Sequence, residues 1–147
     1  MRVLFALLSL LHYVYGQHCM VTPDANGHVN ATALSAALNG STVLGYPDES
    51  TTYPALPNVT NAGFYSCQAL KTIEIPETVE TIGSYAFYNT KLTSVTIPSS
   101  VKTIRNDACL ECKDLVSVDF SHASQLTSIG NYAVSYTHLT LPTILLV

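Results

Sequence analysis

The chain has 147 residues, of which 48% are apolar and 11% are charged. That charged fraction is under half of the roughly 25% found in ordinary globular proteins, which excludes a charge-rich disordered tail. Lysine and arginine together number 6 against 10 acidic residues, and the net charge is -4. A basic nucleic-acid-binding protein is therefore excluded as well.

Residues 1–16 are typical of a secretory signal peptide. Arg2 precedes an apolar run over residues 3–14, and the run ends in Val14-Tyr15-Gly16, which is suited to signal-peptidase cleavage. The run is shorter than the about 20 apolar residues that a membrane span requires. The sequence therefore predicts cleavage after Gly16 and a secreted or cell-surface protein. The alternative is a buried N-terminal helix.

The next segment, residues 17–52, lacks the repeat found further along the chain. Asn30 is a candidate N-cap for a short helix over residues 31–38, which Asn39-Gly40 would end. Asn30, Asn39 and Asn58 also begin N-x-[ST] sequons, which predict glycosylation in a secreted protein. Two interpretations remain open: this N-terminal flank is a cap over the apolar end of the repeats, or it is a mobile glycosylated linker.

Residues 53–133 repeat themselves with a period of 22 to 25 residues. The segment Leu-Lys-Thr-Ile-Glu-Ile-Pro from Leu70 recurs from Leu92 as Leu-Thr-Ser-Val-Thr-Ile-Pro and from Leu115 as Leu-Val-Ser-Val-Asp-Phe-Ser. Apolar and polar residues alternate in each copy, which predicts a short strand with one buried face. The proline lacks an N–H and is expected to end the strand's hydrogen-bond ladder.

The second half of each repeat predicts a return of the chain across the far side of a coil. Val79-x-x-Ile82 makes this crossing, Gly83 allows a turn, and Ala86 and Phe87 pack inward on a short helical turn. One such coil cannot bury its apolar residues alone. Several coils must therefore stack, with each one supplying neighbours to the next.

The full pattern, Leu-x-x-Ile-x-Ile-Pro-x-x-Val-x-x-Ile-Gly-x-x-Ala-Phe-x-x-Cys, resembles the BspA-type, or Treponema-type, leucine-rich repeat. The resemblance implies an α/β repeat solenoid in which short parallel strands stack with short helical turns. Members are typically secreted or surface proteins that act as adhesins or ligand-binding arrays. The chain departs from the pattern at Arg105, Cys109 and Ser121, where the family has Gly, Phe and Pro.

Residues 134–147 do not continue the repeat. They resemble the translation of a common sequencing adapter, so this tail is expected to be foreign to the natural protein. The repeat array would then be incomplete at its C-terminus, and any C-terminal anchor would be missing. The alternative is a divergent coil in which Leu139-Thr-Leu-Pro142 imitates the Ile-Pro end of a strand.

Four cysteines fall outside the signal segment. Cys67 and Cys112 hold the same repeat position two coils apart, and at about 4.8 Å per coil they would be about 10 Å apart. That distance exceeds the ~7 Å Cα limit for a disulfide, so both are expected to be buried, small apolar residues. Cys109 and Cys112 form a C-x-x-C without the context of a redox motif or a zinc site, which favours a Phe-to-Cys replacement in the core. Pairing of Cys19 with Cys67 remains a second possibility.

The remaining polar residues predict no catalytic or metal-binding site. His18, His28 and His122 lack the i, i+4 spacing of metal ligands. Glu74, Glu77 and Glu80 are three apart on a strand and turn, which favours a solvated acidic rim over a catalytic carboxylate pair. We therefore expect no enzymatic activity and no cofactor.

The outward residues of the stacked strands form the candidate binding face. They are expected in two parallel rows, one with Thr72, Ser94 and Ser117 and the other with Glu74, Thr96 and Asp119. Repeat arrays use such extended faces for binding. The sequence thus predicts a recognition or adhesion protein for an extracellular protein or glycan, with no nucleic-acid partner and with membrane contact only through a missing anchor. Three alternatives remain: rows that are merely hydrophilic cover, a structural matrix or wall spacer, or the non-catalytic repeat region of a longer secreted enzyme.

Overall fold

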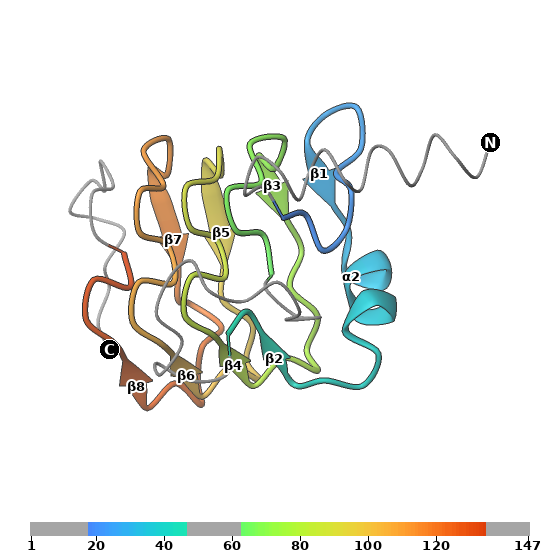
Figure 1. The fold of residues 1–147 in the computed structure, drawn as a ribbon. Coiled ribbons are helices and arrows are strands. Elements are labelled where there is room, and N and C mark those ends of the chain that lie inside the picture. Colours follow the sequence, from blue (N-terminus) through green and yellow to red (C-terminus); the bar gives the residue numbers. More distant parts are fainter. Residues whose placement is uncertain (1–17, 47–62, 135–147) are drawn as a thin grey trace.

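The computed structural model describes residues 18–46 and 63–134 (Figure 1). Short strands, one helix and many turns follow one another in these two stretches. The elements are β1 (His28–Val29), α2 (Ala31–Leu38), β2 (Val43–Leu44), β3 (Thr72–Ile73), β4 (Thr81–Ile82), β5 (Ser94–Thr96), β6 (Thr103–Ile104), β7 (Ser117–Asp119) and β8 (Ser128–Ile129). The predicted signal peptide, Asn58 and the tail from residue 135 lie outside the described residues.

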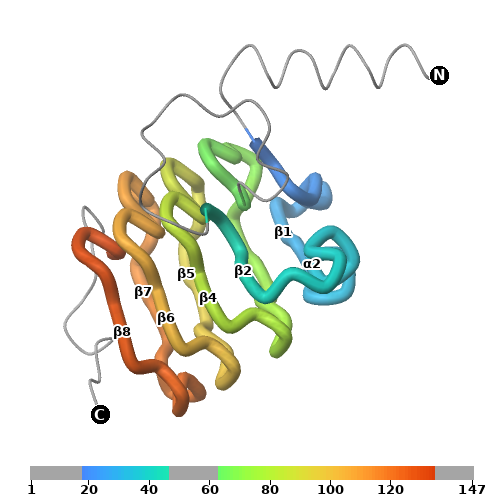
Figure 2. The backbone as a smooth tube through the Cα atoms, turned by 60° about the horizontal axis from the view of Figure 1, so that its bottom comes forward, coloured from blue at the N-terminus to red at the C-terminus, as the bar shows by residue number. Residues whose placement is uncertain are grey.

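The strands form two rows on opposite sides of a shared core, and all their pairings are parallel (Figures 1 and 2). One row is a continuous sheet in the order β2-β4-β6-β8, and the other consists of two sheets, β1-β3 and β5-β7. Ile82 lies opposite Ile104, and Val95 lies opposite Val118. Each repeat position therefore lies beside its counterpart in the next repeat, as the sequence predicts.

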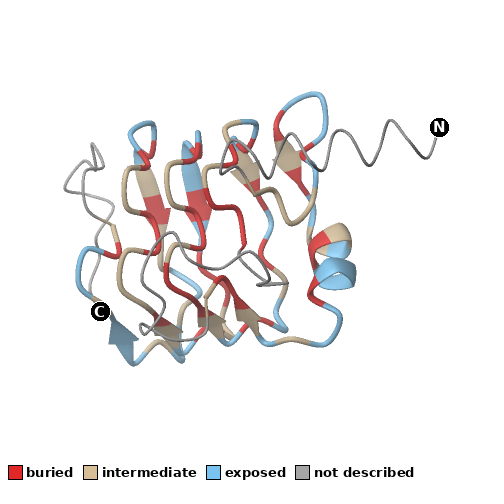
Figure 3. Ribbon diagram, in the orientation of Figure 1, coloured by how far each residue is buried: buried red, intermediate tan, exposed pale blue. Residues whose placement is uncertain are grey.

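The core is built from the apolar positions that the repeat marks (Figure 3). Leu70, Leu92 and Leu115 are each 0% exposed and belong to one buried cluster. The rings of Phe64 and Phe87 stack across neighbouring coils, with centroids 6.1 Å apart. Because equivalent apolar side chains of successive coils lie beside one another, each coil completes the burial of the one before it.

The segments expected to form short helical turns are hydrogen-bonded turns instead. Ala86 and Phe87 do pack inward, both at 0% exposure. However, Tyr85 and Asn89 on either side of them have φ values of 57° and 51°. A right-handed helix cannot continue through residues in the left-handed region, which explains why no helix forms here.

Gly83 begins the turn that the sequence predicts, with its carbonyl accepting the N–H of Ala86 over 3.3 Å, and it also has a second role. It is buried, and its N–H donates to the carbonyl of Leu44 over 2.6 Å. A Cβ at this position would collide with the backbone of Gly45 and Tyr46. The glycine is therefore required by the close approach of two backbones.

The N-terminal flank forms the predicted helix and adds a strand to each row. Asn30 caps α2, with its side-chain oxygen accepting the N–H of Ala33 over 2.8 Å, and Asn39 ends the helix in the left-handed conformation. Leu34 and Leu38 are buried in the common core. The side of the helix that carries them faces the first coil.

Cys67 is not the unpaired residue that its repeat position suggested. It forms a disulfide with Cys19, with the two Cα atoms 5.2 Å apart. The second possibility for Cys67, pairing with Cys19, is therefore the correct one. The flank runs beside the coil because His18 N–H donates to Tyr65 over 2.7 Å and Met20 N–H donates to Gly63 over 3.0 Å. Cys109 and Cys112 are free and buried, as expected.

The far end of the described stack is more exposed than its middle. Ile129 of β8 is 44% exposed, whereas Ile104 at the same position of β6 is 3% exposed. β8 is the edge strand of its sheet. No helix in the described ranges is long and apolar enough to cross a membrane.

Candidate ligand-binding face

The structure places the six predicted face residues on the row formed by β1, β3, β5 and β7. Ser94 lies opposite Ser117, and Thr96 lies opposite Asp119. Val95 and Val118, which alternate with them, point into the core at 3% and 2% exposure. The polar neighbours must therefore point outward. Thr72 and Glu74 take the corresponding places on and directly after β3.

His28 extends this face into the N-terminal flank, which the sequence analysis did not anticipate. His28 lies opposite Thr72 in the β1–β3 pair, and its Nδ1 is 2.8 Å from the hydroxyl oxygen of Thr72. Its Nε2 is 3.5 Å from Glu74, whose other carboxylate oxygen accepts the N–H of Ala31 over 3.2 Å. The flank has no repeat period, and the only sequence signal was one polar–apolar step, His28-Val29, before the helix cap.

The face is interrupted between β3 and β5, which belong to separate sheets. The N–H of Thr93 still donates to the carbonyl of Lys71 over 3.1 Å, just before the two strands begin. Beyond that point β5 pairs with β7, and Ile97 donates to Asp119 over 2.9 Å. The two neighbouring strands therefore separate after this shared hydrogen bond.

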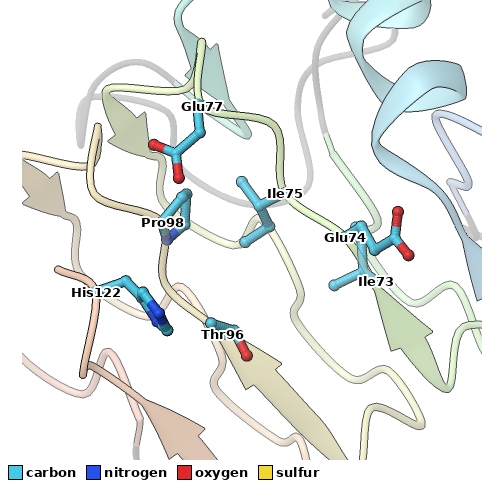
Figure 4. A pocket seen from close by; sticks show the side chains of 7 residues that line it. All are labelled: Ile73, Glu74, Ile75, Glu77, Thr96, Pro98 and His122. Atoms are coloured by element: carbon cyan, nitrogen blue, oxygen red, sulfur yellow. The ribbon is translucent and has the colours of Figure 1, made fainter.

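A cavity of about 340 Å³ lies at this interruption (Figure 4). Three consecutive coils contribute to its lining, which consists of Ile73, Glu74, Ile75, Glu77, Thr96, Pro98 and His122. Only Glu74 and Thr96 among these belong to the predicted face rows. An ideal repeat predicts an unbroken row of strands, so the cavity could not be predicted from the sequence.

Hydrogen bonds keep the carboxylates at this edge of the face ionised. Glu77 accepts the Ser99 hydroxyl over 2.8 Å and the Ser100 N–H over 3.1 Å, and the Ser99 bond is the main cause of its lowered pKa. The Ser121 N–H donates to Asp119 over 2.8 Å and lowers the pKa of Asp119 in the same way. Hydrogen bonds to the charged form of an acid favour that form.

Glu77, Ser99 and His122 occupy the same position in successive coils, but they do not form a nucleophilic triad. A serine nucleophile needs a histidine that accepts its proton and a carboxylate that orients the histidine. Here Ser99 donates directly to the carboxylate, and His122 Nδ1 is 3.0 Å from the hydroxyl of Ser121. In residues 18–46 and 63–134, no group of three or more His, Cys, Asp or Glu side chains could hold a metal ion.

The two described sequon asparagines are exposed and lie at the ends of α2. Asn30 uses its side-chain oxygen as the helix cap, and Asn39 is the left-handed residue at the other end. Asn30 also follows β1 directly and precedes Ala31, which donates to Glu74. A glycan on Asn30 would therefore stand at the edge of the predicted face.

One comparison with known proteins gives a match. Residues 49–145 match the description BspA type leucine rich repeat region, in 6 copies. That range is wider than the predicted repeats and includes most of the tail, whose adapter interpretation lies outside the described residues and stays a prediction. No curated protein and no solved structure matches the chain significantly. Because the matched range covers well over half of the sequence, the chain belongs to the BspA-type leucine-rich-repeat family.

Proposed function

We propose that this chain is a non-catalytic recognition module that binds an extracellular protein or glycan through the face formed by β1, β3, β5 and β7. The observation that supports the proposal is the partly open cavity at the β3–β5 interruption, which hollows the otherwise regular polar face. Family membership supports the role, because repeat arrays of this kind present extended surfaces to partners.

Two features support a secreted or cell-surface location within this proposal. Residues 1–16 carry the pattern of a secretory signal. The disulfide between Cys19 and Cys67 is the kind of bond that persists in oxidising, extracellular compartments. Adhesion to a host or matrix surface is the biological role that this combination favours.

The test replaces Thr72, Ser94 and Ser117 together by lysine and measures capture on immobilised extracellular-matrix proteins and on a glycan array. The three new charges lie on one row of the face, so capture should be lost while the far-UV circular dichroism is retained. The matched control replaces Thr81, Thr103 and Ser128, which occupy the opposite row of strands. Equal capture by both variants would reject this face as the binding surface.

A structural spacer is the second candidate, and the exposed edge strand favours it. Ile129 and Tyr132 at the β8 end are 44% and 66% exposed, and β8 is the outermost strand of its sheet among residues 18–46 and 63–134. An open strand edge can template further pairing. A spacer should self-associate regularly and should ignore soluble ligands. Light scattering over a range of protein concentrations separates this candidate from a monomeric binding module.

A further inference from the structure

The floor of the cavity between β3 and β5 is apolar. Ile73 and Ile75 reach its surface at 8% and 9% exposure, and the buried ring of Pro98 faces them from the next coil (Figure 4). At about 340 Å³ the cavity lies at the small end of the range for ligand pockets. It suits one long side chain better than an extended peptide or a large organic molecule.

The rim of the cavity offers hydrogen-bond acceptors. The carboxylate of Glu77 is exposed at this rim, and one of its oxygens accepts the Ser99 hydroxyl and the Ser100 N–H. The hydroxyl of Thr96 also lines the cavity and has no hydrogen-bond partner in the described part of the chain. Glu74 contributes less, because His28 and Ala31 hold its carboxylate at the far edge.

No lysine or arginine lines the cavity. Three of the lysines form ion pairs elsewhere, namely Lys91 with Asp114, Lys102 with Glu80 and Lys113 with Glu111. Glu77 therefore faces the cavity without a permanently charged cation beside it. This charge pattern repels anions, and the lining provides no phenyl or indole face on which a sugar ring could stack.

We propose that this cavity binds the lysine or arginine side chain of an extracellular protein partner, a proposal that rests on the proposed function of the face. The methylene stem lies on Ile73, Ile75 and Pro98, and the cationic head donates to Glu77 and Thr96. Long basic side chains combine an apolar stem with a charged tip in this way. A charged donor on a carboxylate also makes a stronger hydrogen bond than a neutral pair.

The experiment follows the amide NMR spectrum of the full chain during titration with N-acetyl-arginine amide, N-acetyl-lysine amide and N-acetyl-citrulline amide. Citrulline has the shape of arginine without its charge. The two cationic probes should shift the amide signals that surround the cavity, and citrulline should bind about tenfold more weakly. These signals belong to Glu74, Ile75, Glu77, Thr96, Ile97, Ser99, Ser121 and His122. Equal binding of citrulline and arginine, or no shifts with either cation, would overturn the proposal.

Two variants locate the binding group. Glu77→Gln should weaken the cationic probes about tenfold and leave citrulline unchanged. Glu80→Gln is the matched control, because Glu80 lies on the same coil but pairs with Lys102 outside the cavity. Thr96→Lys, at an exposed position, places a cation at the cavity and should abolish probe binding in a folded protein. If Glu77→Gln and Glu80→Gln behave alike, the assignment to this cavity is wrong.

Rejection of the cavity as a binding site can be distinguished from rejection of the whole face as the binding surface. If the arginine probe does not bind while the triple lysine variant still loses partner capture, the face stands and the cavity assignment falls. If the triple variant captures its partner normally, the proposed function itself is rejected. Probe binding that responds to Glu77→Gln supports the cavity in either case.

Discussion

Cys19 and Cys67 are joined across 48 positions of sequence, and their disulfide fastens the N-terminal flank to the first described coil. Replacing Cys19 by alanine should lower the free energy of unfolding by about 2–4 kcal/mol, because the bond restricts the unfolded chain. Urea denaturation of the native protein and the variant measures this difference. A reducing agent should destabilise the native protein and leave Cys19→Ala unchanged. Equal sensitivity of the two to reduction would contradict the assignment.

The cysteines of the C-x-x-C should remain thiols and should be unreactive in the folded protein. Cys109 and Cys112 are free, and Cys109 is 5% exposed while Cys112 is 0% exposed. The hydrogen bond with Cys112 and burial raise the pKa of the Cys109 thiol well above its ordinary value, which lowers its thiolate fraction. Iodoacetamide followed by mass spectrometry should find both cysteines unmodified in native protein and both alkylated in denaturant. Rapid native alkylation would show that this coil opens.

Asn30 combines a helix cap with a sequon, and two variants separate these roles. Asn30→Ala removes both, and loss of the cap alone should cost about 1 kcal/mol of stability. Thr32→Ala removes the sequon but keeps the asparagine that caps α2. In unglycosylated protein, thermal unfolding should therefore respond to the first variant more than to the second. Similar melting temperatures for the two would show that the cap contributes nothing.

Stability should fall in acid because native hydrogen bonds hold ionised carboxylates. The pKa values of Glu77 and Asp119 are lowered below their ordinary values of 4.5 and 3.8. Their contribution is therefore complete above those ordinary values and is lost as the pH falls through the lower folded values. Urea unfolding from about pH 7 to about pH 3 should show this loss, and Glu77→Gln should make it shallower. An unchanged pH profile in the variant would exclude Glu77 from the effect.

The repeated positions could be predicted from the sequence because burial in this fold depends on the repeat itself. Ile73, Val95 and Val118 recur at one position of the pattern, and all three point into the core. The helix over residues 31–38 could also be predicted from the sequence, since Asn30 and Asn39 are residue types that favour the two ends of a helix. The helix signal lies within a few neighbouring residues, and the repeat signal lies in positions that recur every 22 to 25 residues.

The features that the sequence did not predict, or offered only as a second possibility, depend on contacts between segments with no shared period. His28 reaches Thr72 only because β1 aligns with β3, and Cys19 reaches Cys67 only because the flank runs beside a coil. The cavity arises from a failure of β3 and β5 to pair, whereas an ideal repeat predicts that they do. The binding-face residues are placed on one side of the molecule, and their role in binding remains a prediction.

The two ends of the stack differ in how they are secured, and this gives the molecule a direction of unfolding. At the N-terminal end a disulfide and a capped helix hold the flank on the first described coil, whereas β8 has a strand partner on one side only within the described part of the chain. Since each repeat relies on its neighbours, local opening should start at β8 and progress coil by coil towards the disulfide. Amide hydrogen exchange should accordingly form a gradient along the stack, fastest near Ile129 and slowest around Leu70 and Phe87.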